Sequence, residues 1–467
     1  MQQDESLQGF RHIHLIGAGG IGVSALAQVL HARGYKVTGS DPARSVVTER
    51  LEQMGITIFH EHRAENIAGA SLLVATSAAQ DDNPEIQAAR RQNIPIWKRA
   101  QMLGHLVNDS RAIVVTGAHG KTTITAMLTR LFLDTGLDPT AFIGGDVASL
   151  GGNAVSGRGE WAIAEGDESD GSFVYLKPEI AIVNNIDADH LDFYENIDAI
   201  IEQFNVFLQG IRENGWLLRS ADCALCDKLR PRSDCRVQTY GFSPSADVRG
   251  LDCRSGKDST FCQVEINGRS IGELRLVIPG KHHLHNALAV VAAAAIVGLP
   301  FPQVRESLAR FEGVKRRMEY KGSARGVVVL DDYAHHPTEI QSTIQGLRDR
   351  YNQRIIGVFQ PHLYSRTLKL LNEFGQAFIG LDQLILTDIY PAREKPVPDV
   401  TGEVLLKPVQ QSGVNAVYVH SLQNVPDVLA SQLQPGDIVV TLGAGDVWKI
   451  GERLLERLLE EKESSIP

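Results

Sequence analysis

The sequence predicts an α/β protein with three domains, each built around a mainly parallel sheet. An apolar run, a Gly-rich turn and an amphipathic segment follow one another at residues 12–30 and again at residues 112–132. Between residues 327 and 442, four apolar runs alternate with helical patterns. Such alternation of strand and helix signals is typical of doubly wound α/β sheets. The 467 residues can form several cores, and we expect domains at 1–109, 110–313 and 314–467.

The composition favours a protein that binds no nucleic acid and enters no membrane. The net charge is −10, from 46 basic and 56 acidic residues, and no long basic run occurs, which is unlike a nucleic-acid-binding surface. The longest apolar run, residues 287–299, is too short to cross a bilayer. The first residues are polar and acidic, unlike a secretory signal. We therefore expect a cytoplasmic protein.

Five cysteines lie between residues 223 and 262. Cys223 and Cys226 form a Cys-x-x-Cys motif, but no second pair and no His-x-x-x-His follows at the spacing of a zinc site. We expect reduced thiols that bind no metal.

The segment from Ala112 to Thr123 has the order strand, tight loop, helix that is typical of a phosphate-binding loop. In this arrangement backbone N–H groups and the helix dipole face a polyphosphate, Lys121 neutralises its charge, and the Thr122 hydroxyl reaches Mg²⁺. Val115 stands where the general pattern has glycine, and an ordinary Gly-rich turn is the alternative. The predicted phosphate-binding residues are Gly117, Ala118, His119, Gly120, Lys121, Thr122 and Thr123.

A second glycine pattern, Gly17-x-Gly19-x-x-Gly22, follows the apolar run at residues 12–16. This spacing matches the dinucleotide fingerprint, in which missing side chains let backbone N–H groups approach a pyrophosphate. Asp41 ends the next apolar run about twenty residues on, which is the usual position of a ribose-binding acid. Taken alone, the pattern predicts a nucleotide, with NAD as the first guess. An NAD-binding or regulatory module is therefore one alternative function.

Two acidic clusters follow apolar runs of the central region: Glu165-Gly-Asp-Glu-Ser-Asp170 and Asp187-Ala-Asp-His-Leu-Asp192. Because parallel strands end at one edge of a sheet, we expect both clusters beside the phosphate loop. Carboxylates and a histidine there suit Mg²⁺ or Mn²⁺, while a solvated acidic loop is the alternative. Farther on, three histidines precede Asn286 at the start of an Ala-rich segment. We favour a helix N-terminus with Asn286 near a base edge over a metal site.

Together these motifs resemble those of the Mur ligase family. The resemblance covers almost the whole chain in the family's order. It implies an N-terminal Rossmann-like domain for a UDP-linked substrate, a central phosphate-loop ATPase domain and a C-terminal Rossmann-like domain for an amino acid. It also redirects the first Gly-rich turn from NAD to the UDP-substrate. The matching segments are residues 17–22, 117–123, 165–173, 187–192, 331–337 and 360–367.

The resemblance implies an ATP-dependent ligase of peptidoglycan precursor synthesis. Either a monomer or a homodimer is open from the sequence. ATP would phosphorylate the lactyl carboxylate of UDP-N-acetylmuramate, and the amine of L-alanine would attack the resulting acyl phosphate. The implied roles are γ-phosphate binding by Lys121, metal binding by Thr122, Glu165 and His190, adenine contact by Asn286, and phosphate contact by Arg317.

The resemblance also implies substrate residues. Tyr333, His335 and Arg366 would lie near the amino acid, and Arg366 is the candidate for binding its carboxylate, because Leu363 stands where some members have Arg. The nearest alternative is the related ligase that attaches a recycled tripeptide to the same UDP-substrate. The implied UDP-substrate residues are Gly17, Gly19, Gly20, Ile21, Gly22, Asp41 and Ser77. The implied catalytic residues are Lys121, His190, Arg317 and His335.

Overall fold

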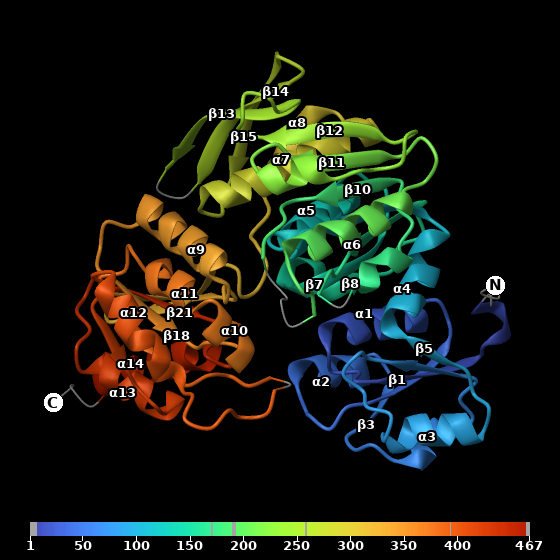
Figure 1. The fold of residues 1–467 in the computed structure, drawn as a ribbon, viewed down its shortest axis with the longest axis horizontal. Coiled ribbons are helices and arrows are strands. Elements are labelled where there is room, and N and C mark those ends of the chain that lie inside the picture. The colour runs from blue at the N-terminus through green and yellow to red at the C-terminus, as the bar shows by residue number, and fades with distance from the viewer. Residues whose placement is uncertain (1–6, 170, 189–192, 257–258, 393, 464–467) are drawn as a thin grey trace. The chain divides into compact units, whose positions relative to one another are not determined.

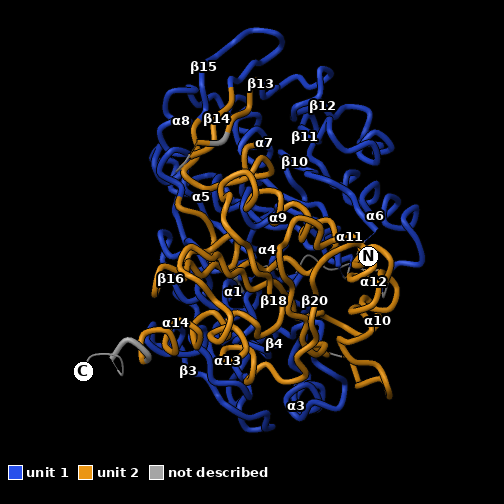
Figure 2. Tube along the Cα trace, turned by 90° about the vertical axis from the view of Figure 1, so that its left-hand side faces the viewer, with its two compact units in different colours: residues 1–251, 263–274, 285–311 blue, residues 252–262, 275–284, 312–467 orange. Residues whose placement is uncertain are grey.

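The computed structural model describes residues 7–169, 171–188, 193–256, 259–392 and 394–463. Its strands form three sheets (Figure 1), which confirms the predicted α/β fold class. The chain divides into two compact units (Figure 2). Residues 1–251, 263–274 and 285–311 belong to the first unit, and residues 252–262, 275–284 and 312–467 belong to the second.

The N-terminal sheet has five parallel strands in the order β3-β2-β1-β4-β5. α1 and α3 lie on opposite faces of this sheet (Figure 1). Successive strand residues point to opposite faces, so Leu72 packs in the apolar core that contains α1 and Leu73 packs in the core that contains α3. Its strands are β1 (His12–Ile16), β2 (Lys36–Ser40), β3 (Thr57–Phe59), β4 (Leu72–Ala75) and β5 (Ile96–Lys98). Its helices are α1 (Ile21–Ala32), α2 (Val46–Gln53), α3 (Pro84–Arg91) and α4 (Arg99–Asn108).

The second sheet has ten strands in the order β15-β14-β13-β12-β11-β10-β6-β9-β7-β8. Strands β6, β9 and β10 are parallel neighbours, so the phosphate loop and both acidic clusters follow the same edge. The antiparallel hairpin of β7 and β8 was not predicted from the sequence. The strands are β6 (Arg111–Thr116), β7 (Thr140–Val147), β8 (Gly152–Val155), β9 (Trp161–Glu165), β10 (Ile180–Val183), β11 (Trp216–Ser220), β12 (Arg236–Gly241), β13 (Val248–Ser255), β14 (Thr260–Ile266) and β15 (Arg269–Leu276).

Four helices accompany this part of the chain: α5 (Lys121–Asp134), α6 (Ile197–Gln209), α7 (Lys281–Val297) and α8 (Phe301–Ala309). The Ala-rich segment is helical and residues 287–294 of α7 are buried, as expected for a core helix. β14 and β15 are neighbours joined by a tight turn. The turn residues Asn267 and Gly268 have φ of 50° and 75°, the left-handed values of a type I′ turn.

The third sheet has the order β16-β17-β21-β18-β19-β20, with only the β16–β17 pair antiparallel. The four apolar runs recognised in the sequence are its strands β17, β18, β19 and β21. The strands are β16 (Glu319–Ala324), β17 (Val327–Asp332), β18 (Ile355–Phe359), β19 (Gln383–Leu386), β20 (Ala416–Tyr418) and β21 (Ile438–Leu442). The helices are α9 (Pro337–Arg350), α10 (Tyr364–Lys369), α11 (Leu371–Ala377), α12 (Leu406–Gln411), α13 (Val425–Ala430) and α14 (Trp448–Glu463).

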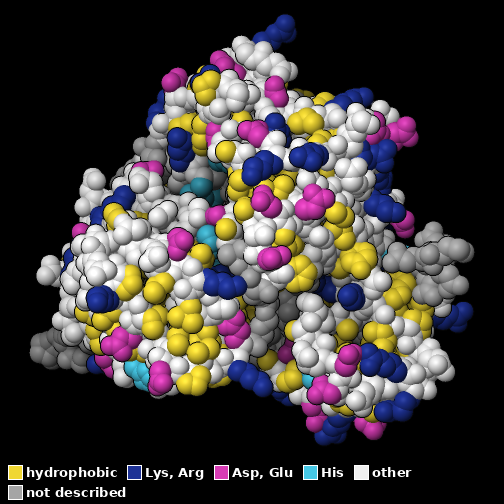
Figure 3. All heavy atoms as spheres, viewed as in Figure 1, with side chains coloured by type: hydrophobic (Ala, Val, Ile, Leu, Met, Phe, Trp, Pro, Cys, Tyr) yellow, Lys and Arg dark blue, Asp and Glu magenta, His cyan; other side chains and the backbone are white. Residues whose placement is uncertain are grey.

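The surface and the cysteines agree with the composition. Within the described residues, no helix is both long and apolar enough to cross a membrane. On the face drawn in Figure 3, basic and acidic side chains are interspersed. All five cysteines are free thiols.

A buried carboxylate supports the first Gly-rich turn. Glu85 is fully buried and accepts hydrogen bonds from Ser40 Oγ at 2.7 Å and Asn66 Nδ2 at 2.6 Å, with His14 Nε2 3.7 Å away. Burial by itself raises the pKa of Glu85, but His14, Ser40 and Asn66 outweigh it and hold the pKa below the ordinary value. The carbonyl oxygen of Ser40 in turn accepts the N–H of Gly17 at 2.8 Å.

We expect Glu85→Ala to lower the free energy of unfolding by about 3 kcal/mol, because it leaves buried polar groups without their acceptor. Glu85→Gln, which keeps the shape of the side chain, should lower the free energy of unfolding by less. Because the folded-state pKa is depressed, this contribution is present above the unfolded-state pKa and is lost as pH falls through the folded-state pKa. Urea unfolding at neutral pH and at about pH 3, below the ordinary glutamate pKa of about 4.3, tests this. A difference between wild type and Glu85→Ala that does not shrink on acidification would contradict it.

Candidate active site

The phosphate loop joins β6 to α5 and requires two glycines. Gly117 and Gly120 have left-handed φ of 124° and 86°. A Cβ on Gly117 would lie 2.7 Å from the carbonyl oxygen of Asn185, and one on Gly120 would lie 2.5 Å from Nδ2 of Asn184. Gly120 is the N-cap of α5 and provides no side-chain cap. This helix N-terminus is therefore suited to an anionic ligand.

Two asparagines after β10 hold the loop. The carbonyl oxygen of Asn185 accepts the N–H of Ala118 at 3.2 Å, and its Oδ1 accepts the N–H of His119 at 2.8 Å. Asn184 Nδ2 donates to the carbonyl oxygen of His119 at 2.8 Å and to Oδ1 of Asn286 at 3.0 Å. Asn286 is only 4% exposed. It therefore lies packed against the loop, and its contact with a base stays a prediction.

Lys121 folds back over its own loop. Its Nζ donates to the carbonyl oxygens of Gly117 at 2.7 Å and Ala118 at 3.3 Å, and to Oε1 of Glu168 at 2.7 Å. The side chains of Lys121 and Glu168 are 14% and 4% exposed. Sequence analysis did not single out Glu168 within its acidic cluster, because only the path of the chain after β9 decides which carboxylate reaches Lys121.

Three carboxylates share this one ammonium. Burial by itself lowers the pKa of Lys121, but Glu168, Asp167 and Glu165 outweigh it and raise the pKa above the ordinary value. Burial raises the pKa of Glu168 to about 7, against the effect of Lys121, and also raises the pKa of Glu165. Three carboxyl groups thus face one ammonium, and a bound cation would favour the ionised forms of Glu165 and Glu168.

The predicted metal ligands Thr122 and Glu165 lie together. Thr122 Oγ1 donates to Glu165 Oε1 at 3.1 Å, and the N–H of Gly144 donates to Oε2 at 2.8 Å. Hydroxyl and carboxylate oxygens are ligands that Mg²⁺ and Mn²⁺ prefer, so these residues fit such an ion. His190, the other predicted ligand, lies outside the described residues. In the same acidic cluster, Asp187 Oδ2 lies 3.2 Å from Nε2 of the loop residue His119.

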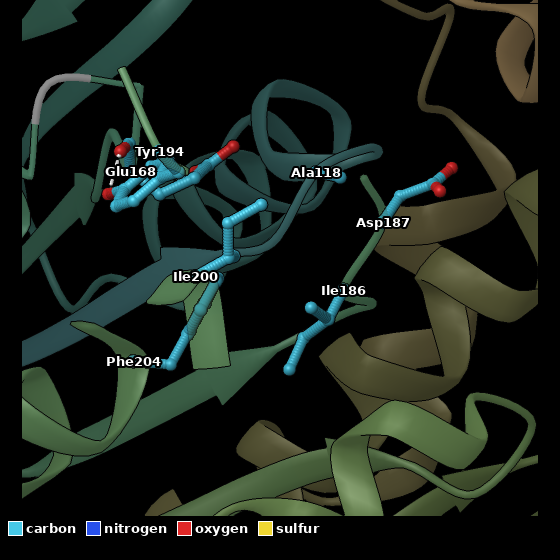
Figure 4. Close-up of a pocket in the computed structure, with 7 residues that line it drawn as sticks. All are labelled: Ala118, Glu168, Ile186, Asp187, Tyr194, Ile200 and Phe204. Atoms are coloured by element: carbon cyan, nitrogen blue, oxygen red, sulfur yellow. Dashed lines mark hydrogen bonds between the residues drawn. The ribbon is translucent and has the colours of Figure 1, made fainter. Parts of the chain in front are cut away.

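A small cavity lies beside the loop (Figure 4). Tyr194 and Glu168 lie close together on one side of it, and Ala118 and Asp187 lie on the other. The hydroxyl of Tyr194 donates to the carbonyl oxygen of Glu168 at 2.5 Å, which anchors the first acidic cluster. The lining residues are Ala118, Glu168, Ile186, Asp187, Tyr194, Ile200 and Phe204.

The first Gly-rich turn is held by β2. Gly17 has a left-handed φ of 79°, and the N–H of Gly19 donates to Oδ2 of Asp41 at 2.9 Å. Oδ1 of Asp41 accepts a second backbone N–H, from Ala43, at 3.0 Å. Asp41 therefore supports the turn, and its contact with a substrate stays a prediction. Ser77 is exposed in the turn after β4. The remaining predicted residues Gly20, Ile21 and Gly22 lead into α1.

Arg99 places a positive charge near this turn. A Cβ on Gly22 would lie 3.1 Å from Arg99 Nη1. The Arg99 guanidinium also lies 3.9 Å from the carboxylate of Asp167 and 3.5 Å from the hydroxyl of Ser172. Sequence analysis missed Arg99 because no motif surrounds it.

In the second unit, the predicted residues Tyr333, His335 and Arg366 come together around His362. The rings of Tyr333 and His335 lie 5.3 Å apart, and those of His335 and His362 lie 5.7 Å apart. Nη1 of Arg366 lies 3.3 Å from Nδ1 of His362. His362 was not singled out from the sequence, although it lies in the Gln-Pro-His segment that follows β18.

Arg317 lies against the same cluster. Its Nη1 is 3.4 Å from Oε1 of Glu339, and its guanidinium lies 5.3 Å from the ring centre of Tyr333. Arg316 also lies over this ring, at 4.9 Å, and pairs with Asp331 at 3.1 Å. Tyr333 therefore packs beside two guanidinium groups.

Leu363 has an unusual backbone. Its φ is 69°, its side chain is buried, and it precedes the first turn of α10. The first turn of α10 carries Arg366, which is also buried. Leu363 thus contributes to packing.

Comparison with known protein families matches nearly the whole chain. Residues 12–111 match "Mur ligase family, catalytic domain", residues 115–294 match "Mur ligase middle domain", and residues 316–445 match "Mur ligase, glutamate ligase domain". The chain belongs to the Mur ligase family. This confirms the resemblance found in its motifs.

Individual Mur ligases are similar over their full length. The UDP-N-acetylmuramate–L-alanine ligase of Geotalea uraniireducens is 44% identical over 447 residues, covering 96% of this chain and 98% of the relative. The solved UDP-N-acetylmuramate–alanine ligase of Thermotoga maritima has a TM-score of 0.83 and 29% identity, covering 96% and 99% of the two chains. A solved murein peptide ligase of Psychrobacter arcticus has a TM-score of 0.72 and 25% identity, and the match covers 96% of this chain and 98% of the ligase.

We expect Gly120→Ala to damage the phosphate loop far more than Gly136→Ala. Both glycines have left-handed φ, but a Cβ on Gly136 meets no atom within 4 Å, whereas one on Gly120 would collide with Asn184 and Asn286. Backbone strain alone costs about 1–2 kcal/mol. Gly136→Ala should therefore lose about that much stability and keep nucleotide binding.

The Gly120→Ala variant should in addition bind a nucleoside triphosphate about tenfold or more weakly, because the displaced phosphate loop no longer directs its N–H groups at a phosphate. Thermal unfolding and equilibrium binding measure the two effects. Equal affinities in the two variants would contradict the assignment.

Proposed function

We propose that this chain is an ATP-dependent ligase that joins L-alanine to the lactyl carboxylate of UDP-N-acetylmuramate in peptidoglycan precursor synthesis. The observation that carries the reaction type is the single site in which Lys121, Thr122 and Glu165 lie at one edge of the sheet. The near-full-length relatives that bear this activity in their names support the choice of substrates.

In the proposed reaction, the lactyl carboxylate attacks the γ-phosphorus of ATP, and ADP leaves as an acyl phosphate forms. The amine of L-alanine then attacks the acyl carbon, and the tetrahedral intermediate expels phosphate as the amide forms. Lys121 neutralises charge on the transferred phosphoryl group, and the N-terminus of α5 binds its oxygens. Such transfers depend mainly on positioning and on charge neutralisation.

We further propose that Thr122 and Glu165 hold a divalent cation, Mg²⁺ or Mn²⁺, and that His190 holds a second one. The first pair is supported by oxygen atoms 3.1 Å apart, beside the other carboxyl groups that face Lys121. When bound, such an ion would offset the negative charge of the phosphates.

The test is the release of inorganic phosphate with ATP, UDP-N-acetylmuramate and L-alanine present, and with each one omitted in turn. We expect full release only when all three are present. Replacing L-alanine by a diaminopimelate-containing tripeptide tests the second candidate, the recycling ligase, whose fold this chain shares. Preference for the tripeptide would assign the chain to that activity instead.

We expect Glu165→Gln to raise the Mg²⁺ concentration needed for half-maximal activity by about tenfold or more, because a neutral amide binds a hard cation weakly. Glu160→Gln is the matched control, since Glu160 lies just before β9 and pairs with Arg111 at 3.2 Å. An Mg²⁺ titration of Glu165→Gln that coincides with that of Glu160→Gln would remove Glu165 from the metal site.

Arg366 is proposed to bind the carboxylate of L-alanine, since guanidinium and carboxylate can pair through two parallel hydrogen bonds. The contact with His362 supports this role, because it orients the guanidinium. A pocket for one methyl group separates L-alanine from an amino acid of slightly different size by only about 1–3 kcal/mol. Glycine and serine should therefore be slow substrates.

Arg366→Ala should raise the KM for L-alanine by about tenfold or more and leave the KM for UDP-N-acetylmuramate nearly unchanged, because only one substrate loses a charge-assisted contact. Arg348→Ala is the control, since Arg348 pairs with Asp382 in the same unit. Initial rates with each substrate varied measure both constants. A parallel change in the two, or no change, would exclude Arg366 as the carboxylate-binding residue.

A further inference from the structure

The hairpin of β7 and β8 contacts the proposed metal ligand Glu165. β7 runs beside β9, with Phe142 paired to Ala164, so the residues after Phe142 pass next to Glu165. There the N–H of Gly144 donates to Oε2 of Glu165 at 2.8 Å. A Cβ on Gly144 would lie 2.3 Å from this oxygen, so the contact requires glycine. The hairpin therefore fixes one oxygen of the carboxylate.

Two residues farther on, the same hairpin binds α2. Nη1 and Nη2 of Arg50 donate to the two carboxylate oxygens of Asp146 at 2.9 and 3.1 Å. Gly152, on the returning strand, leaves space for this contact, because a Cβ there would lie 2.6 Å from Nη1 of Arg50. A pair with two parallel hydrogen bonds defines both the distance and the orientation of the elements it joins.

The returning strand also binds α1. Asn153 is 1% exposed. Its Nδ2 donates to the carbonyl oxygen of Ile21 at 2.6 Å and to Oγ of Ser24 at 3.0 Å, and its Oδ1 accepts from Nε2 of Gln28 at 2.9 Å. Ile21 is the first residue of α1 and directly follows the Gly-rich turn. A buried amide with these bonds specifies one arrangement of the groups around it.

We propose that the β7–β8 hairpin, through Asp146 and Asn153, sets the position of the Gly-rich turn relative to Glu165, and so brings the carboxylate of the UDP-substrate to reacting distance from the terminal phosphate of ATP. This inference rests on the proposed function. The phosphate loop belongs to one sheet and the Gly-rich turn to another, so their separation must be set by contacts between the two. Asp146 and Asn153 are positioning residues, because they act through α2, α1 and the turn.

Positioning of this kind affects the rate more than the affinity. Reacting atoms must be held at about 3–3.5 Å, and a displacement of about 1 Å can cost up to about 100-fold in rate. The side chains of Arg50 and Asp146 are 23% and 19% exposed, so removing one partner also costs stability. A loss of kcat that the reversed pair recovers, with the KM for ATP nearly unchanged, would therefore indicate a change in geometry.

The experiment compares Asp146→Ala, Asn153→Ala and the reversed pair Arg50→Asp with Asp146→Arg. We expect Asp146→Ala to lower kcat by about tenfold with the KM for ATP changed by less than about twofold, and the reversed pair to recover most of the loss. Glu179→Gln is the matched control. Glu179 makes a similar double hydrogen bond with Arg111, at 2.9 and 2.6 Å, but within one sheet.

Hydrogen exchange of residues 17–24 and 140–155 supplies a measurement independent of activity. We expect faster exchange in Asn153→Ala than in wild type and no change in Glu179→Gln. A kcat for Asp146→Ala equal to that of Glu179→Gln, or a loss that the reversed pair does not recover, would overturn the inference. If the wild-type chain releases no substrate-dependent phosphate, the proposed function fails, and unchanged exchange in Asn153→Ala would separately refute the hairpin's role.

Discussion

The active-site edge of the central sheet depends on the electrostatic balance around Lys121. One buried ammonium faces Glu165, Asp167 and Glu168, and these carboxylates outweigh the effect of burial on its pKa. Lys121 favours the ionised form of each of these carboxyl groups, so its removal would leave them without a positive partner in a region of low dielectric, where an unpaired charge is costly. Because burial raises the pKa of Glu165 and Glu168, we expect a polyphosphate at this edge to need a divalent cation as well as Lys121.

Backbone geometry makes this concentration of charge possible. Parallel pairing of β6 with β9 and β10 brings the ends of three strands to one edge. Gly117 and Gly120 then let the loop approach Asn184 and Asn185 more closely than any side chain would allow. The asparagines satisfy loop N–H and C=O groups that would otherwise be buried without partners. The loop is thus held by hydrogen bonds from the neighbouring strand end.

The second unit uses a different chemistry. Its predicted site residues are connected by ring contacts and guanidinium stacking among Tyr333, His335, His362 and two arginines, with Asp331 and Glu339 as counter-charges. Arg366, which contacts His362, adds a cationic group that is suited to a carboxylate. This agrees with the proposed role of the unit in binding L-alanine.

The sequence by itself indicated the fold class and predicted the phosphate loop, because glycine spacing and apolar runs are local signals that need no knowledge of packing. The resemblance of several motifs, in their order along the chain, indicated the family. The sequence also indicated that Glu165 and Thr122 belong to one site, since parallel strands end at one edge. The tertiary structure decided which residues contact them. Arg99 lies in no motif. Glu168 and His362 lie in motifs, but a motif does not show which of its side chains makes a contact, and the β7–β8 hairpin has weak strand signals and many glycines. Their positions depend on contacts between segments distant in the chain, such as Arg50 with Asp146, and periodicity does not encode such contacts.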